Sequence, residues 1–583
     1  MRAGWTMAGA VGVVVMMMTG VVMVGGMSVD DVARARSLDT VIVEHLRHYL
    51  HRHQQEQHLL QRHQQQELLR VTYHSRLARY IEEYDNLLAG KHGSRRHGPR
   101  DGTGGRMMKE EENEGTDPVE GLLVSRRLVR DWHRLREAPL GDSWQEVVSG
   151  VAGAEVGLGG VAGSREQLAA MTHALMRVHH VYRLHAPHLA RGRLHHHHDK
   201  PLRAADVAGV GVAALENGLY GRAAEWFTAA HDAHQEEGPE RNGTRTHLDI
   251  LLHLATAAHD YKLSQEGFAN QPGIYPRPLS QVPVAEQLLK ARQQEEREEQ
   301  QQQERGAGSD LTTTTSISAT PRDELIYSRL CRGHTFMSAR EASQLKCRVD
   351  RRGSAWLTLM PALVEEHSLD PPILSFHHVL SDHQLAVIRH LALPLLEQAK
   401  VQDSNKGEEG SPIQKHRSSY TAWLPAHAHP TLRAASRMVA AITGLEVSEE
   451  RGEAEMLQVN QYGNGAHYDP HMDFLALYHR IWEAEQPDEK LIKQHPNGDR
   501  IATLMFYMND VEEGGRTVFP RVGVGVEPRR GSAVFWWNLL PCGRGDVRML
   551  HAACPVLRGT KWVSNKWIKS YPQLHHRPCL PLS

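Results

Sequence analysis

The sequence predicts a multidomain protein with an all-α N-terminal half and a C-terminal domain built as a β-sandwich or jelly roll. At 583 residues the chain is long enough for about three or four domains of ordinary size. Hydrophobic residues recur with the period of an α-helix through the first half. Beyond residue 320 this period gives way to short segments rich in Val, Ile, Phe, Trp and Tyr, which Gly and Pro separate.

The N-terminal helical region runs from Val32 to about Leu88. Its leucines stand among Gln, His, Arg and Glu, as in long polar helices that self-associate as coiled coils. A Gly-, Arg- and Glu-rich stretch at 90–116 follows and is typical of a disordered loop. We expect the helix to resume from Asp117 to Arg136 with a proline in its first turn, and another helix from Arg165 to Leu184.

Residues 204–234 carry the small and aromatic rhythm of a tetratricopeptide-type helix–turn–helix, and a further helix is expected from His247 to Leu263. One such hairpin is too few for a long solenoid, so we expect a small helical module. Gln293–Arg305 consists of Glu, Gln and Arg, and Thr312–Thr320 is rich in Ser and Thr. This composition predicts a linker that begins as an exposed helix.

Four segments of the C-terminal part alternate with the period of a strand. They are Ile501–Met508, Ser532–Leu539, Met549–Leu557 and Lys561–Ile568. A chain that is helical first and β-rich last is therefore expected.

The N-terminus indicates the compartment. An apolar run from Met7 to Gly26 ends in small residues, which is the pattern of a secretory signal peptide, although its length also suits an uncleaved membrane anchor. Asn242-Gly-Thr is a glycosylation acceptor consistent with secretion. The formal net charge of −2 provides no positive field, so no nucleic-acid partner is indicated.

Five cysteines fit an oxidising lumen. Cys331 and Cys347 are neighbours in the sequence, as are Cys554 and Cys579, and Cys542 is left over. Two local disulfides and one free thiol are the simplest assignment. No short-spaced Cys or His/Cys pairs of a zinc site are present in the sequence.

A candidate metal motif, H-x-D, lies at His471 and Asp473. On a strand, residues i and i+2 project from the same face, so an imidazole and a carboxylate can share one metal. The same pattern at 197–199 and 247–249 lies in loop and helix contexts, where the two side chains do not converge. Well downstream of the motif, His551 stands at the start of an apolar segment, and Lys561 opens the segment that follows. This order and spacing single out the motif among 40 histidines.

The three candidate ligands, His471, Asp473 and His551, would occupy one face of iron(II) and leave three adjacent positions open. The 2-oxo acid end of 2-oxoglutarate would take two of these positions and dioxygen the third. The far carboxylate of 2-oxoglutarate needs a buried cation, which Lys561 can supply. The alternative is a β-domain with surface His and Lys and no metal.

From about Ser328 to Ile568 the chain resembles the catalytic region of animal collagen prolyl 4-hydroxylase α subunits. The segments that carry the resemblance are Tyr462–Phe474, Arg500–Val518, Gly531–Leu539, His551–Leu557 and Lys561–Trp567. The resemblance implies a double-stranded β-helix (jelly-roll) oxygenase domain that uses Fe(II), 2-oxoglutarate and L-ascorbate. Such an enzyme hydroxylates proline at C4 in X-Pro-Gly sequences of collagen-like chains and releases succinate and CO2.

The resemblance also assigns residues. It makes His471, Asp473 and His551 the iron ligands and Lys561 the residue that binds 2-oxoglutarate. By the same resemblance, Tyr462 and Thr503 would line the cosubstrate pocket, and Trp567 would lie near the substrate proline. The pairs Cys331/Cys347 and Cys554/Cys579 match the two disulfides of the family.

The resemblance extends upstream and divides the chain. It implies a dimerisation domain at 28–164, a tetratricopeptide-like peptide-binding domain at 165–268 and the oxygenase domain at 321–583. The composition adds a signal peptide at 1–26, a disordered insert at 90–116 and a linker at 269–320. The resemblance also implies protein disulfide isomerase as β subunit in an α2β2 tetramer, and retention in the endoplasmic reticulum lumen. Four aromatic residues either line the peptide groove or pack between helices: Tyr182, Tyr220, Trp226 and Tyr261.

The sequence departs from the family pattern at three places. Ile250 and His253 stand where groove tyrosines are expected, and Lys569 replaces a histidine near the cosubstrate. A short insertion lies between Asp473 and Ile501. These departures leave the iron chemistry intact. They leave open a second reading, in which the substrate is another secreted proline-rich protein or the hydroxylated residue is lysine. A catalytically silent subunit that binds proline-rich chains is the third alternative.

Overall fold

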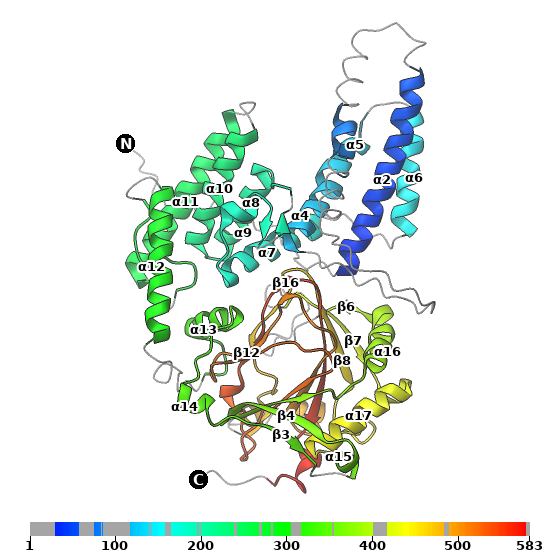
Figure 1. Ribbon diagram of the computed structural model, residues 1–583, viewed down its shortest axis with the longest axis vertical. Coiled ribbons are helices and arrows are strands. Elements are labelled where there is room, and N and C mark those ends of the chain that lie inside the picture. The colour runs from blue at the N-terminus through cyan, green and yellow to red at the C-terminus, as the bar shows by residue number, and fades with distance from the viewer. Residues whose placement is uncertain are drawn as a thin grey trace, which may run out of the picture.

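The computed structural model places a group of helices above a β-rich domain (Figure 1). It describes residues 29–56, 75–82, 84, 117–138, 142–157, 165–194, 197–198, 200–237, 242–267, 271–280, 284–304, 316–351, 355–399, 417–482 and 489–578. The apolar run Met7–Gly26 and the insert at 90–116 lie outside these residues. None of the described helices combines the length and the apolar character that a membrane span needs.

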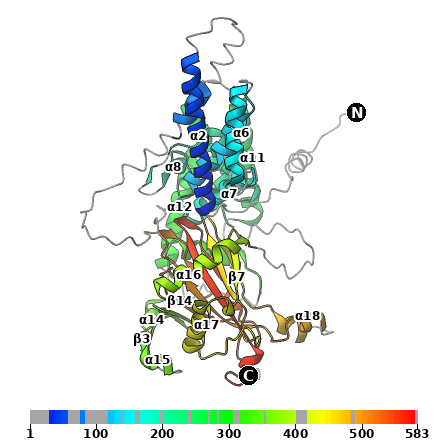
Figure 2. The ribbon, with the colours of Figure 1, turned by 90° about the vertical axis from the view of Figure 1, so that its right-hand side faces the viewer.

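The N-terminal helices share an apolar core. They are α2 (Val29–Glu56), α4 (Pro118–Arg126), the π-helix η1 (Arg127–Trp132), α5 (His133–Arg136) and α6 (Asp142–Gly157). Figures 1 and 2 show α2 and α6 side by side. The Asp117 carboxylate caps α4 by accepting hydrogen bonds from the backbone N–H groups of Val119 and Glu120 at 2.8 and 3.0 Å. The expected helix from Asp117 to Arg136 is therefore confirmed.

The next helices form a compact module. They are α7 (Arg165–Tyr182), α8 (Ala186–Ala190), α9 (Ala204–Glu216), α10 (Tyr220–Glu237), α11 (Asn242–Glu266) and α12 (Val284–Glu304), with a short hairpin of β1 (Arg193–Leu194) and β2 (His197–His198). α9 and α10 are the predicted helix–turn–helix. They approach so closely that a Cβ on Gly211 would lie 2.6 Å from the Phe227 ring, which leaves room only for glycine.

Helix α12 begins closer to the N-terminus than the exposed helix expected at Gln293–Arg305, and this earlier part of it is packed. Its Leu288 and Ala291 are buried in the core of the helical half. Its Arg292 donates to the Glu225 carboxylate of α10 at 3.2 Å, and Arg222 of α10 donates to Glu295 of α12 at 3.1 and 3.2 Å. The many charges of this segment therefore face both solvent and a buried ionic cluster, which the composition alone does not distinguish.

The C-terminal part is built from antiparallel strands in two main sheets. In the described residues the larger sheet has the order β3-β4-β5-β14-β10-β17-β8-β7-β6, and the smaller has the order β13-β12-β15-β9. The larger sheet contains β3 (Cys347–Asp350), β4 (Ala362–Leu369), β5 (Pro372–His377), β14 (Ala533–Trp537), β10 (Arg500–Tyr507), β17 (Lys561–Lys569), β8 (Leu457–Tyr462), β7 (Tyr420–Leu424) and β6 (Glu397–Gln398). The smaller contains β13 (Val524–Val526), β12 (Thr517–Phe519), β15 (His551–Ala553) and β9 (Tyr468–His471), while β11 (Glu513–Gly514) pairs with β16 (Val556–Arg558).

All four predicted strand segments are confirmed, with one refinement. The segment Met549–Leu557 forms two short strands, β15 and β16, which Cys554 and Pro555 separate. Proline cannot donate a hydrogen bond to a sheet, so a strand boundary at this point is expected.

The larger sheet has two different faces. Along β10, Ala502, Leu504 and Phe506 pack with helices α16 (Asp382–Ala392) and α17 (Pro430–Thr443). Met505 and Tyr507 point the other way and pack with residues of the smaller sheet. Because side chains alternate along a strand, Thr503 shares the second face and points between the sheets.

The remaining helices lie at the edges of this domain. They are α13 (Pro321–Cys331), α14 (Ala339–Ala342), α15 (Ala355–Leu359) and α18 (Glu489–Gln494). Figure 2 shows α18 projecting away from the sheets. It belongs to the insertion predicted between Asp473 and Ile501, of which 483–488 lie outside the described part.

The disulfide prediction is wrong for the cysteines that the structure describes. Cys331 at the end of α13 pairs with Cys554, 223 residues away, with a Cα–Cα distance of 5.5 Å. Cys347 is a free and exposed thiol, and Cys542 is also free. Cys579 lies outside the described residues. Short sequence separation favoured the local pairs, but a disulfide requires Cα atoms within about 7 Å, which only the fold decides.

We expect a non-reducing tryptic map to yield a peptide that joins Cys331 to Cys554. Cys347 should react with a thiol reagent in the native protein, since its side chain is exposed. A peptide that joins Cys331 to Cys347 would contradict the structure. Reduction before digestion is the control, because it should release both cysteines as separate peptides.

Candidate metal centre

The structure brings His471, Asp473 and His551 together between the two sheets. His471 is the last residue of β9, Asp473 follows just beyond it, and His551 opens β15. β9 and β15 are antiparallel neighbours, and His471 and His551 are Cα partners in their register. The potential ligand atoms of all three residues lie within 4.8 Å of one another. In the described part of the chain, this is the one such group of three or more His, Cys, Asp or Glu side chains.

Backbone carbonyls orient both imidazole rings. His471 Nδ1 lies 2.8 Å from the carbonyl of Asp469, and His551 Nδ1 lies 3.0 Å from the carbonyl of Met549. A carbonyl oxygen can only accept, so each ring carries its proton on Nδ1 and leaves the Nε2 lone pair for a metal. The two Nε2 atoms lie 3.8 and 3.6 Å from the Asp473 carboxylate.

The electrostatics hold these groups in the states that a divalent metal requires. Burial lowers the pKa of His471 to about 3, and His551 acts in the same direction, so the His471 ring is neutral at physiological pH. Burial would raise the pKa of Asp473, but His551, His471 and Arg500 outweigh it and keep the pKa below its usual value. A neutral imidazole and an ionised carboxylate are ready ligands for iron(II).

A hydrogen-bond chain from the larger sheet orients Asp473. Thr503 of β10 donates its hydroxyl to Asp473 Oδ2 at 2.7 Å. The Asn538 amide donates to the Thr503 hydroxyl at 2.8 Å, and both residues are fully buried. Such outer partners fix the ligand and raise its affinity for the metal. Thr503, which was predicted to line a cosubstrate pocket, hydrogen-bonds directly to the candidate metal ligand Asp473.

A second set of charges supports Asp473 from its backbone side. Arg500 donates to the Asp473 carbonyl at 3.3 Å and stacks over Trp567, with the guanidinium carbon 3.6 Å from the ring centroid. Glu455 binds Arg500 at 2.7 and 2.8 Å and also binds Lys569 at 2.8 Å. Lys569 therefore neutralises a half-buried carboxylate in this network. Trp567 is 6% exposed, and its Cα partner on β10 is Thr503.

Lys561 is a buried cation on β17, on the inner side of the sheet. Its side chain is 1% exposed, and its ammonium donates to the Thr517 hydroxyl at 3.1 Å. The rings of Tyr462 and Tyr507 lie 5.8 and 5.6 Å from the ammonium. Burial lowers the pKa of Lys561 to about 7, and the charge of Glu527 only partly opposes this shift. A buried lysine with so little compensation suits an incoming carboxylate.

Several residues of this centre carry no signal in the sequence. Asn538, Arg500 and Thr517 act through contacts between strands that are far apart in the chain. Trp536 packs 4.8 Å from the His551 ring, and Tyr468 stacks 3.5 Å from the His471 ring. Strand alternation could have indicated that Thr503 points inward, but not which residue it meets.

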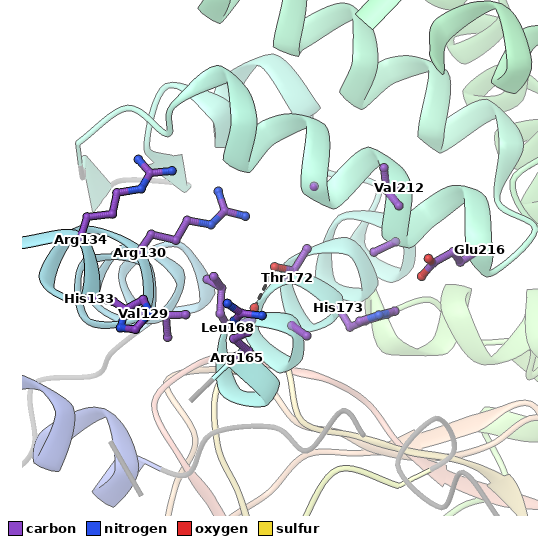
Figure 3. Close-up of a pocket in the computed structure, with 13 residues that line it drawn as sticks. Val129, Arg130, His133, Arg134, Arg165, Leu168, Thr172, His173, Val212 and Glu216 are labelled. Carbon is purple, nitrogen blue, oxygen red and sulfur yellow. Dashed lines mark hydrogen bonds between the residues drawn. The ribbon is translucent and has the colours of Figure 1, made fainter. Parts of the chain in front are cut away.

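A cavity of about 520 Å³ lies away from these ligands (Figure 3). Its lining residues come from η1, α5, α7 and α9 of the helical half. Arg130 at its edge already pairs with Asp206 at 2.9 Å. The metal centre is therefore not defined by this cavity but by the convergence of side chains between the sheets.

A two-sheet antiparallel domain with a His-x-Asp and a distant His on paired strands defines an iron(II)- and 2-oxoglutarate-dependent oxygenase. Residues 457–569 match the 2OG-Fe(II) oxygenase superfamily. The matched range runs from β8 to the end of β17 and contains every residue assigned above to the metal centre except Glu455.

Comparison with known proteins identifies the family. A rat prolyl 4-hydroxylase subunit alpha-1 is 41% identical over 43% of this chain and 45% of its own length, so the chain spans about half of such relatives. A chicken prolyl 4-hydroxylase subunit alpha-2 is 31% identical over 79% of this chain and 84% of its own length. A viral collagen prolyl hydroxylase structure is 25% identical, covers 34% of this chain and 96% of its own, and has a TM-score of 0.25. The chain belongs to the prolyl 4-hydroxylase α-subunit family.

We expect Thr503→Val to weaken Fe(II) binding by about 10-fold or more, since Asp473 loses its hydroxyl donor and the buried Asn538 amide loses its acceptor. Anaerobic Fe(II) titration of the full chain measures the change. Thr228→Val on α10 is the matched control, because that hydroxyl bonds only the Ala224 carbonyl of its own helix. Equal affinities in the two variants would contradict the role of Thr503.

The affinity for 2-oxoglutarate should fall as pH rises above about 7. Without cosubstrate, Lys561 titrates near pH 7. The carboxylate of 2-oxoglutarate stabilises the protonated form of Lys561, so binding above this pH requires uptake of a proton by the lysine. The apparent Kd should therefore rise by up to about 10-fold per pH unit. Lys561→Arg should remove this dependence because guanidinium stays protonated. A wild-type Kd that stays constant from pH 6 to 9 would contradict it.

Proposed function

We propose that this protein hydroxylates proline at C4 in X-Pro-Gly sequences of collagen-like chains. The observation that carries the proposal is the convergence of His471, Asp473 and His551 with a buried Lys561 inside the matched oxygenase region. A catalytically silent subunit has no physical reason to keep these polar groups buried and oriented. Names of family relatives supply the proline substrate.

Iron(II), 2-oxoglutarate and O2, when bound, supply the oxidation that converts a proline C–H bond into C–OH, with release of succinate and CO2. His471, Asp473 and His551 would hold the iron. Lys561 would hold the far carboxylate of 2-oxoglutarate, and the Tyr462 ring beside it would shape the same pocket. L-ascorbate, typical of this family, would restore iron that has been oxidised in uncoupled turnovers.

The C-terminal domain would serve this chemistry as a double-stranded β-helix, or jelly roll, with the reaction taking place between its two sheets. Its interior is lined by apolar and aromatic side chains from both sheets, including Tyr507, Phe519 and Trp536. Water exclusion by these side chains strengthens the pull of Lys561 on an anion. Trp567, on the strand next to Thr503, would lie near the substrate proline.

The helical module would bind the substrate chain as a tetratricopeptide-like domain. Helix α11 exposes Ile250, His253, Ala257 and Tyr261, which lie on one face at helical spacing. Tyr261 is 70% exposed and Ile250 is 53% exposed, so both are available to proline rings. Trp226, in contrast, is fully buried and donates to His179 at 3.0 Å, so it packs between helices.

The compartment and the partner belong to the same proposal. A secretory signal peptide at 1–26, a dimerisation domain at 28–164, a peptide-binding domain at 165–268 and an oxygenase domain at 321–583 would place the enzyme in the endoplasmic reticulum lumen. Protein disulfide isomerase would act as its β subunit in an α2β2 tetramer. The disulfide between Cys331 and Cys554 fits an oxidising compartment.

A turnover assay tests the function. The full chain, expressed with and without protein disulfide isomerase, receives Fe(II), 2-oxoglutarate, ascorbate and a Pro-Pro-Gly repeat peptide. We expect one oxygen added per modified proline, with matching succinate. His471→Ala should lower turnover by more than the roughly 10- to 100-fold that loss of an outer partner of a metal ligand costs. The exposed His383→Ala on α16 should leave turnover unchanged.

Three outcomes would separate the alternatives. Succinate without peptide oxidation would indicate an oxygenase with another substrate, and lysine-containing peptides would be tried next. Bound Fe(II) without any succinate would indicate a silent binding subunit. Equal turnover with and without the isomerase would refute the proposed dependence on that partner.

A further inference from the structure

The turn at 463–466 connects the two strands that carry the active-site residues. β8 ends at Tyr462, and β9 ends at His471. This turn lies against helices α4 and α7 of the helical half, which come much earlier in the chain. The Gly-Asn-Gly sequence of the turn takes no direct part in the chemistry proposed above.

Two side-chain hydrogen bonds attach the turn to the helices. Arg177 of α7 donates to the Gly465 carbonyl at 2.7 Å. The Asn464 amide donates to the carbonyl of Asp117, the N-cap of α4, at 3.1 Å. On its other side, the Gly465 N–H donates to the Val556 carbonyl at 2.8 Å. The turn is therefore held between the helical half and the strand β16.

Gly465 allows the helix to approach this closely. Its φ is +64°, and a Cβ at this position would lie 2.6 Å from Ala174 Cβ and 2.9 Å from the Ala174 carbonyl oxygen. Both the backbone conformation and the space exclude any larger residue. The backbone of the turn is thus in direct van der Waals contact with helix α7 at Ala174.

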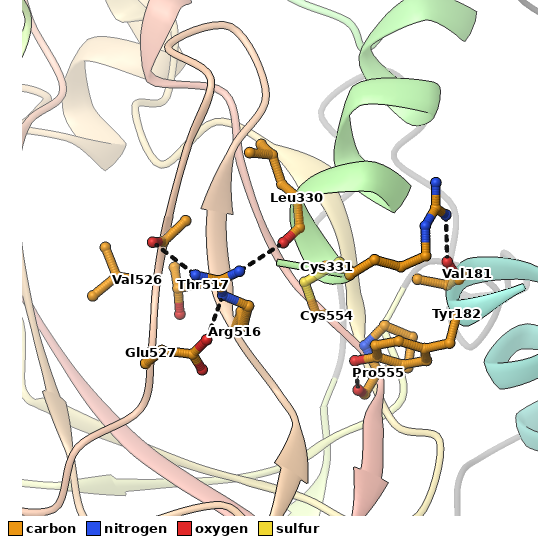
Figure 4. The surroundings of a disulfide bond; sticks show 12 residues. Val181, Tyr182, Leu330, Cys331, Arg516, Thr517, Val526, Glu527, Cys554 and Pro555 are labelled. Carbon is orange, nitrogen blue, oxygen red and sulfur yellow. Dashed lines mark hydrogen bonds and ion pairs between the residues drawn. A yellow bond between two sulfur atoms is a disulfide. The ribbon is translucent and has the colours of Figure 1, made fainter. Parts of the chain in front are cut away.

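A second attachment lies at the end of β15, the strand that begins with the third candidate ligand. The Tyr182 hydroxyl, at the end of α7, donates to the Pro555 carbonyl at 2.6 Å, and Arg332 donates to the Val181 carbonyl at 2.8 Å. The disulfide from Cys331 to Cys554 ties α13 to the same corner, as Figure 4 shows. This corner directly follows β15, which begins with His551.

The helix also acts on the residue that orients His471. The Asp469 carbonyl accepts the Nδ1 proton of His471. The Asp469 carboxylate pairs with His467 Nε2 at 2.9 Å, and it partly opposes the lowering of the pKa of the half-buried Arg177 by desolvation. Helix α7 therefore contacts the turn that precedes β9 through Arg177 and the corner that follows β15 through Tyr182.

We propose that helix α7 is a positioning element of the iron centre, in which Arg177 and Tyr182 hold the two ligand-bearing strands at their working separation. All ligands belong to the oxygenase domain, but their strands keep this separation only when the helical half is docked on them. Substrate binding on the helical module and iron binding between the sheets are thereby mechanically connected. The inference rests on the iron centre of the proposed function and not on the identity of its substrate.

The test compares variants of the full chain by anaerobic Fe(II) titration in the presence of 2-oxoglutarate, followed by the charge-transfer absorption of the ternary complex. Arg177→Ala should raise the Kd for Fe(II) by about 10-fold or more, as expected for loss of an outer partner. Arg177→Lys should restore most of the affinity, because it keeps a cationic donor. Arg165→Ala, an exposed arginine on the same helix, should bind Fe(II) like the wild type.

Two glycine-to-alanine variants distinguish the loss of helix docking from the effect of backbone strain. Gly465→Ala and Gly444→Ala both place alanine at a positive φ, +64° and +70°, but a Cβ at Gly444 meets nothing within 4 Å. The inference predicts weakened Fe(II) binding only for Gly465→Ala. If Gly465→Ala does not fold, Tyr182→Phe, which removes a single hydroxyl, should still raise the Kd or alter the absorption band.

Two results would overturn the inference. One is wild-type Fe(II) affinity and absorption in folded Arg177→Ala and Tyr182→Phe variants. The other is equal loss of affinity in Gly465→Ala and Gly444→Ala. A wild-type chain that binds Fe(II) but does not hydroxylate proline peptides would refute the proposed function alone, since the Kd values decide the inference separately.

Discussion

The antiparallel pairing of β9 with β15 is the constraint on which the metal centre depends. It places His471 opposite His551, although the two histidines are far apart in the chain. Asp473, just beyond β9, then completes a triangle of ligand atoms within 4.8 Å. Two imidazoles and one carboxylate gain little from one another, so this arrangement favours a divalent cation over any internal pairing.

The charged residues around the ligands differ in how far a neighbouring charge compensates them. Buried charges are costly unless each has a partner; here Asp473 and Lys561 are buried, and Arg500 is half-buried. Arg500 is compensated by Glu455, which also takes the charge of Lys569. In the described part of the chain, Lys561 has hydroxyl and ring contacts and a partial compensation by Glu527. The protein thus contains one compensated cation, Arg500, and one less compensated cation, Lys561, which is the proposed partner of the cosubstrate.

The two halves of the molecule meet at the back of this centre. Helix α7 contacts the turn before β9 and the corner after β15, and the disulfide of Cys331 with Cys554 strengthens that corner. A helical module that would bind the substrate chain is therefore packed on the strands that would bind iron. This geometry gives a physical route by which occupancy of one half can affect the other.

The sequence by itself determined the helical half, the strand segments and the identity of the metal-binding residue types, because hydrophobic period and the H-x-D spacing are local properties. It could not choose the disulfide partner of Cys331, the role of Thr503 or the burial of α12. It also did not indicate that the Gly-Asn-Gly turn contacts the helical half. Each of these depends on which distant segments come within a few ångströms of one another, and only the tertiary structure decides such distances.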